Sequence, residues 1–161
     1  MRWLWVVLVA GLLFGCFASD KPVLHDYQVV APFQQITFRK QGGEEKPTVL
    51  TREGVTYVTG TEADKLTFRL MAVEDDWFVV ELGAIKDGAP QFLYVYTRAD
   101  PHNGIAETYR SVAGPNDVGP GLRDCDMGVC IDDIDAYVAH MKAVIDAGEK
   151  PDTIYDITTT E

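Results

Sequence analysis

Residues 66–96, LTFRLMAVEDDWFVVELGAIKDGAPQFLYVY, contain three apolar segments separated by two short turn sequences. The segments are rich in β-branched and aromatic residues, which favour strands. The separators contain Asp75-Asp76 and Asp87-Gly88. Asp-Gly is typical of a two-residue type I′ hairpin turn, because both positions accept a positive φ. The stretch therefore predicts three consecutive antiparallel strands.

The strand pattern continues on both sides, over residues 49–112, with further turn signals at residues 60–64 and at Asn103-Gly104. Asn-Gly favours the same type I′ turn as Asp-Gly. Turn signals recur along this region at a spacing that suits short strands joined in sequence. This arrangement predicts an antiparallel meander.

The two faces of the predicted sheet differ from strand to strand. Leu66, Phe68, Leu70 and Ala72 alternate with other residues, which predicts one buried face on the first strand. Residues 77–82 and 92–96 are apolar on both faces, so each side of those strands must be covered. We expect a helix on one side, and sheet curvature, an N-terminal strand or a partner on the other.

A helix is predicted over residues 133–147. Asp132 is expected as its N-cap, with acidic residues in the first turn that suit the helix dipole. Gly148 and Pro151 are typical of a helix end. Residues 153–158 are a predicted last strand. The apolar stripe expected to pack on the sheet consists of Ile134, Tyr137, Val138, Met141 and Ile145.

These elements together predict one α+β domain. We expect a curved antiparallel β-meander of five or six strands with a C-terminal helix packed on it. The chain has 161 residues, of which 47% are hydrophobic, and this suits a single folded domain. Lys and Arg number 14 against 25 Asp and Glu, giving a net charge of −11. Such an acidic surface repels polyanions, so no nucleic acid is expected as a partner.

The N-terminus has the order of an export signal. Met1-Arg2 supplies one positive charge, and no charged residue follows until after Ser19. Leu13-Phe14-Gly15-Cys16 resembles the lipobox of bacterial lipoproteins. The resemblance implies that residues 1–15 are a signal peptide of the lipoprotein type, that Cys16 is acylated, and that the protein is anchored in a membrane of the cell envelope, facing the periplasm.

Two alternatives for the leader stay open. Cys16 and Ala18 also supply the two small residues of an ordinary cleavage site, and cleavage after Ala18 would give a secreted or soluble periplasmic protein. An uncleaved anchor is the second alternative, although its uncharged stretch is short against the roughly 20 residues that span a bilayer. On the lipoprotein interpretation, residues 16–47 form a tether and a first strand, and residues 48–161 form the globular domain.

The remaining cysteines are Cys125 and Cys130. With Cys16 assigned to lipid, they form an even pair, and an oxidising compartment predicts a disulfide between them. We interpret this disulfide as a structural staple before the helix. Catalytic thiol chemistry is less favoured, because the neighbouring Asp124 and Asp126 would raise a thiol pKa.

No catalytic, cofactor-binding or metal-binding residues are predicted. Ser19 and Ser111 do not lie in a Gly-x-Ser-x-Gly motif. The acidic residues 124–135 lack the ligand spacing of a calcium loop. The histidines His25, His102 and His140 are scattered, so zinc is not expected. An aromatic set could line a ligand cavity in a curled sheet, but core packing is the simpler interpretation: Trp77, Phe78, Phe92, Tyr94, Tyr96 and Tyr109.

Residues 50–157, with the strand pattern, the late Cys pair, the helix and the segment from Pro151 to Tyr155, resemble a group of small exported proteins from proteobacteria. The resemblance implies no activity. We expect a non-catalytic binding or assembly module, with the membrane as one partner through the lipid anchor and another envelope protein as a candidate partner. Its small-molecule ligand, if it has one, is not named by any motif.

A small secreted enzyme or a small-ligand-binding barrel is the alternative. An apolar cavity without titratable groups would favour binding. A pocket that holds Arg69, Arg98 or His102 beside buried carboxylates would favour an enzyme.

Overall fold

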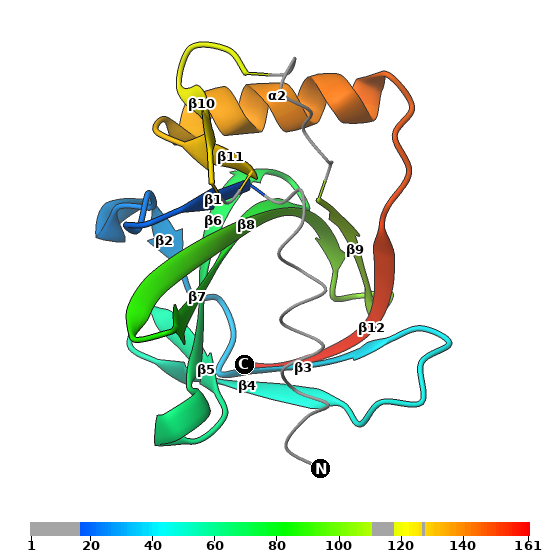
Figure 1. The fold of residues 1–161 in the computed structure, drawn as a ribbon. Coiled ribbons are helices and arrows are strands. Elements are labelled where there is room, and N and C mark those ends of the chain that lie inside the picture. Colours follow the sequence, from blue (N-terminus) through cyan, green and yellow to red (C-terminus); the bar gives the residue numbers. More distant parts are fainter. Residues whose placement is uncertain (1–16, 111–117, 127) are drawn as a thin grey trace.

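The computed structural model describes residues 17–110, 118–126 and 128–161 (Figure 1). Within these residues twelve strands belong to one sheet. The helices of this part are the α-helix α2 (Ile134–Asp146) and the short 3-10 helices η1 (Asp26–Gln28) and η2 (Glu62–Asp64). The strands are β1 (Phe17–Ser19), β2 (Val29–Val30), β3 (Gln35–Lys40), β4 (Thr48–Glu53), β5 (Thr56–Thr59), β6 (Leu66–Glu74), β7 (Trp77–Lys86), β8 (Ala89–Asp100), β9 (Ile105–Tyr109), β10 (Leu122–Cys125), β11 (Gly128–Ile131) and β12 (Thr153–Thr160).

Eight of the strands close into an antiparallel barrel. Strands β3 to β9 each pair with the next along the chain. After the helix, β12 returns and pairs with β9 through residues 153–156 and with β3 through residues 155–160. Figure 1 looks into this barrel and shows β12 beside both strands. The barrel therefore has no free edge between β3 and β9.

The predicted α+β fold, a curved antiparallel meander of five or six strands with a C-terminal helix, is wrong, because the described chain is mostly strand. Its hairpins exist, but the sheet has more strands and is closed by β12. Residues 35–40, which lie in the predicted tether and first strand, and residues 48–53 form two strands of the barrel wall. Closure was missed because it depends on pairs such as Ile157 with Phe38, which lie far apart in the sequence.

The tight turns follow the sequence in part. Asp87 and Gly88 have φ values of 52° and 79°, as a type I′ turn requires. At the other predicted turn Gly104 alone has a positive φ, so the β8–β9 connection is a longer loop. Asp100 closes that loop by accepting hydrogen bonds from the backbone N–H and the side-chain amide of Asn103. These hydrogen bonds lower the pKa of Asp100.

Helix α2 packs on the outside of the barrel (Figure 1). Its N-cap is Asp133, whose side chain accepts from the Asp135 N–H, so the prediction of Asp132 was displaced by one residue. The predicted stripe is confirmed. Three of its residues are buried and two are partly buried against the core: Ile134, Tyr137 and Met141, then Val138 and Ile145.

Strands β10, β11 and β1 extend the sheet from β8, beneath the helix. β1 pairs with β8 on one side and with β11 on the other. Cys125 and Cys130 form a disulfide across the β10–β11 hairpin, with 5.8 Å between their Cα atoms, which confirms the predicted disulfide. Across residues 17–110, 118–126 and 128–161, there is no helix of the length and apolar character that crossing a membrane requires.

Candidate functional site

The wall of the barrel has two faces, and the strand register assigns each side chain to one of them. On β7, Val79 and Glu81 point outward toward the helix side, and Phe78, Val80 and Leu82 point inward. The same alternation continues consistently around all eight strands. By this register the interior face includes the apolar and aromatic residues Ile36, Phe38, Leu50, Tyr57, Leu66, Phe68, Leu70, Ala72, Phe78, Val80, Leu82, Ala84, Leu93, Val95, Ala99, Ala106, Tyr155 and Ile157, and the polar residues Thr48, Arg52, Thr59, Gln91, Thr97, Thr108 and Thr159.

Ring contacts confirm the direction of this face. The ring centroids of Phe38 on β3 and Phe68 on β6 are 6.4 Å apart, although β4 and β5 lie between these strands in the sheet. Phe38 also meets Tyr155 edge-on at 5.5 Å. Side chains from strands that are separated by two others meet in this way across the middle of the barrel.

The interior face is largely apolar, and several of its large apolar side chains are not completely buried. Phe38, Phe68, Phe78, Val80 and Leu82 all remain partly exposed. Large apolar side chains in a closely packed core are normally almost fully buried. The interior of this barrel therefore keeps apolar surface that its own side chains do not cover.

One end of the barrel is crossed by residues 31–34. The Tyr57 hydroxyl donates to the Phe33 carbonyl at 2.9 Å and accepts from the Phe33 N–H at 3.0 Å. Arg52 Nη1 donates to the Ala31 carbonyl at 2.9 Å. Since Tyr57 and Arg52 belong to the interior face, this segment runs across the barrel opening. It closes the end at which β3 begins.

The polar groups that point into the barrel are an arginine, an amide, hydroxyls and phenols, and the phenols are neutral at physiological pH. Burial raises the pKa of Tyr57 and of Tyr155. Thr97 is buried, and its hydroxyl has no hydrogen-bond partner among the residues that the structure describes. Buried polar groups are usually hydrogen-bonded, so the Thr97 hydroxyl is a candidate contact for a bound molecule.

A buried charged cluster lies on the opposite, outer face of the wall. Glu81 is 1% exposed, and its Oε1 accepts from Arg69 Nη1 at 3.0 Å. Its Oε2 accepts from the Tyr94 hydroxyl and from the backbone N–H groups of Val23 and Leu24. Arg69 therefore lies beside a buried carboxylate, which is part of the arrangement that would indicate an enzyme. However, both oxygens are occupied by the protein itself, so the cluster latches residues 23–24 onto the barrel and offers no free oxygen to a substrate.

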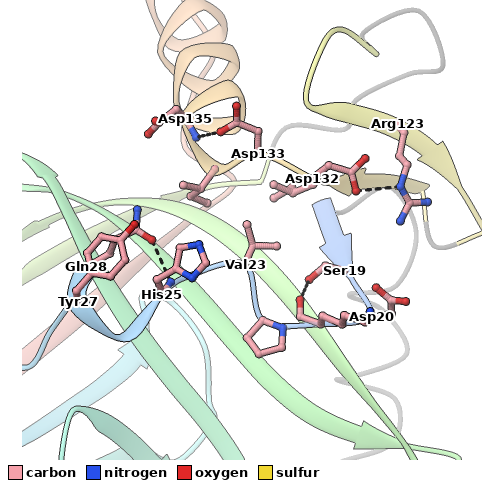
Figure 2. A pocket seen from close by; sticks show the side chains of 14 residues that line it. Ser19, Asp20, Val23, His25, Tyr27, Gln28, Arg123, Asp132, Asp133 and Asp135 are labelled. Atoms are coloured by element: carbon pink, nitrogen blue, oxygen red, sulfur yellow. Dashed lines mark hydrogen bonds and ion pairs between the residues drawn. The ribbon is translucent and has the colours of Figure 1, made fainter.

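A surface groove with a volume of about 720 Å³ lies between residues 19–28 and the start of helix α2 (Figure 2). Two of the four aspartates that line the groove accept hydrogen bonds from the protein itself. Asp132 accepts from Arg123 Nε at 3.0 Å, and Asp133 caps the helix by accepting from the Asp135 N–H at 2.9 Å. In the described part of the chain, no group of three or more His, Cys, Asp or Glu is arranged to hold a metal ion.

The structure separates most of the residues that the sequence singled out. Cys16 lies outside the described residues. His140 lies on the helix with its ring 5.3 Å from that of Phe17, and His102 lies in the β8–β9 loop. Most of the aromatic set packs on the outer face against the helix side, and Phe78 is its one member on the interior face.

Sequence reasoning missed the contributions of β3, β4 and β12 to the interior. The alternation of Ile36 and Phe38 with polar neighbours was a usable signal, but it is only two residues long.

The fold defines an up-and-down barrel of eight strands with a helix packed outside it. Comparisons with protein-family models, with curated proteins and with solved structures found no match for the chain.

Proposed function

We propose that this protein is a lipid-anchored, non-catalytic binding protein of the cell envelope, whose barrel takes one small, largely apolar ligand. The observation that carries the proposal is the partly exposed apolar interior face. An eight-stranded barrel is just wide enough either to be filled by its own side chains or to hold one small ligand. Accessible Phe68, Val80 and Leu82 favour the second alternative.

The chemistry of the interior face limits the ligand class. Its phenols stay neutral, and Arg52 already donates to the Ala31 carbonyl. The Thr97 hydroxyl is the one buried interior oxygen without a partner in the described residues. A neutral apolar molecule with a single hydrogen-bonding group fits this lining. Because residues 31–34 close one end, the ligand would enter from the opposite end.

The proposal is tested by titrating the purified full chain with N-phenyl-1-naphthylamine, a neutral apolar dye that fluoresces in dry surroundings. We expect saturable binding of one dye per chain. Val80→Trp places a large ring inside the barrel and should weaken binding at least tenfold. Ile85→Trp is the matched control, because Ile85 lies on the same strand but is 77% exposed. It should bind like the wild type.

A second variant guards against misfolding of Val80→Trp. Thr97→Val keeps the side-chain shape and removes the unpartnered hydroxyl, so the fold should persist while the affinity for a ligand with a hydrogen-bonding group changes. Absence of saturable dye binding by the wild type would overturn the proposal. So would equal binding by Val80→Trp and Ile85→Trp when both are folded.

A further inference from the structure

The first described residues are part of the folded core. Phe17, Ala18 and Ser19 form β1 and are 0%, 0% and 3% exposed. β1 is held on both edges. Phe17 pairs with Tyr94 of β8 and with Val129 of β11. A strand between two others cannot be removed without leaving unpaired backbone groups on both neighbours.

The side chains of β1 are equally engaged. The Phe17 ring packs edge-on against Tyr137 of the helix at 4.9 Å. The Ser19 hydroxyl shares a hydrogen bond of 2.8 Å with the Tyr94 hydroxyl, which donates to Glu81. β1 therefore joins the barrel wall, the helix and the buried charged cluster.

These contacts discriminate between the two cleavage sites that the leader allows. Cleavage after Ala18 would delete the Phe17 ring from its place against Tyr137. It would also create a charged amine on Ser19, which is almost fully buried, and a buried charge without a partner is strongly unfavourable. Cleavage on the N-terminal side of Phe17 leaves all of β1 in place.

We infer that the exported protein keeps Phe17 and Ala18 as a structural strand, so that its leader is removed upstream of Phe17 and the domain is attached without a flexible tether. The inference rests on the export that forms part of the proposed function. The step is hydrolysis of one peptide bond. At the Gly15-Cys16 bond, water adds its hydroxyl to the Gly15 carbonyl carbon and its proton to the Cys16 nitrogen.

The absence of a tether has a mechanical consequence. One residue spans at most about 3.6 Å, so an acyl group on Cys16 would lie within a few ångströms of β1. The domain would be held directly against the bilayer rather than at the end of a long linker.

The direct test is the N-terminus of the full chain after expression in a Gram-negative host. Intact-mass analysis of protein extracted from membranes should show a chain that begins at Cys16. A chain that begins at Ser19 would overturn the inference, and so would an intact chain that still begins at Met1. The readout is independent of ligand binding: a start at Cys16 without dye binding would reject the barrel ligand alone.

Stability of the processed protein gives a second test. Phe17→Ala should lower the thermal unfolding midpoint by roughly 6 to 20 °C, the range for loss of a buried Phe ring in a domain of this size. Lys21→Ala, at an exposed position nearby, is the matched control and should change the midpoint little. Equal, small shifts in both variants would show that β1 is dispensable and would overturn its structural role.

Discussion

The two faces of strands β7 and β8 carry similar side chains but have different surroundings. On the outer face, Val79, Tyr94 and Tyr96 are 0% to 1% exposed, because helix α2, β1 and residues 23–24 cover them. On the inner face, Val80, Leu82 and Val95 remain partly exposed, although they are just as apolar. Hydrophobicity alone therefore does not tell a sealed core from a binding surface. What decides is whether another element of the chain covers the face.

The comparison also separates the stabilising role of one face from the binding role of the other. The outer face contains the buried cluster and the helix contacts, so its variants should alter stability. Several inner-face residues are less completely buried, so variants at these positions should alter binding more than stability. Four predictions test this division, from the largest expected effect to the smallest.

Loss of Arg69 should have the largest effect. Arg69→Met leaves Glu81 buried without its countercharge, and breaking a buried ion pair from one side costs roughly 3–5 kcal/mol. Arg39→Met is the control, because the Arg39–Asp156 pair is about half exposed and exposed pairs contribute at most about 1 kcal/mol. Urea unfolding measures the free energy of unfolding of both variants. Similar losses in the two variants would contradict a latching role for the buried cluster.

The helix contact should come next. Met141 is fully buried, and Met141→Ala should cost roughly 2–5 kcal/mol of unfolding free energy. Lys142→Ala removes only an exposed ion pair with Glu74 and should cost less than about 1 kcal/mol. The measurement compares the urea unfolding midpoints of Met141→Ala and Lys142→Ala. If they coincide, the helix is not what seals the outer face.

Alkaline pH should weaken the outer face. Burial, together with the nearby Glu74 carboxylate, raises the pKa of Tyr96 to about 12 from its ordinary value of 10. The folded protein therefore holds this proton longer than the unfolded chain does. The stability contributed by the raised pKa of Tyr96 is fully present below about pH 10, and it is lost as the pH rises to about 12. Unfolding midpoints between pH 9 and 12 should fall less steeply for Tyr96→Phe than for the wild type. If the midpoints of both proteins fall equally with pH, Tyr96 does not cause the loss of stability.

The smallest effect is expected from two adjacent valines of β7. They give the most direct comparison, because Val79 lies on the outer face and Val80 on the inner face. Val79→Ala on the sealed face should cost about 2 kcal/mol, from two buried carbon groups plus a cavity. Val80→Ala on the inner face should cost less than about 1 kcal/mol, because Val80 is already partly exposed. Dye affinity should change only in Val80→Ala. Equal stability losses would mean that the barrel interior is as closely packed as the outer core.

The face assignment on β6 shows where sequence patterns fail. Alternation predicted that Leu66, Phe68, Leu70 and Ala72 form the buried face. In the structure these residues are on the interior side, where Ala72 is exposed and the other three are partly buried, whereas the intervening Met71 is buried against the core. Both faces of this strand are partly covered. The alternation correctly grouped these four residues on one face, but the other face is the more closely packed one.

Other parts of the site gave no sequence signal. Glu81 looks like one acidic residue in an apolar strand until Val23, Leu24 and Arg69 are seen around it. The Thr97 hydroxyl becomes notable only because nothing in the described residues pairs with it. The lipidation predicted at Cys16 stays a prediction.

The sequence by itself determined the local elements. Asp87-Gly88 forms its type I′ turn, Asp133 and the apolar stripe form helix α2, and Cys125 closes a short loop with Cys130. Each of these depends on residues only a few positions apart, whose backbone preferences and spacing act without the rest of the fold. Tertiary structure decided the barrel, its inner face and the core position of β1. These depend on contacts such as Gln41 with Asp156, which are 115 residues apart and form only when the whole chain has closed.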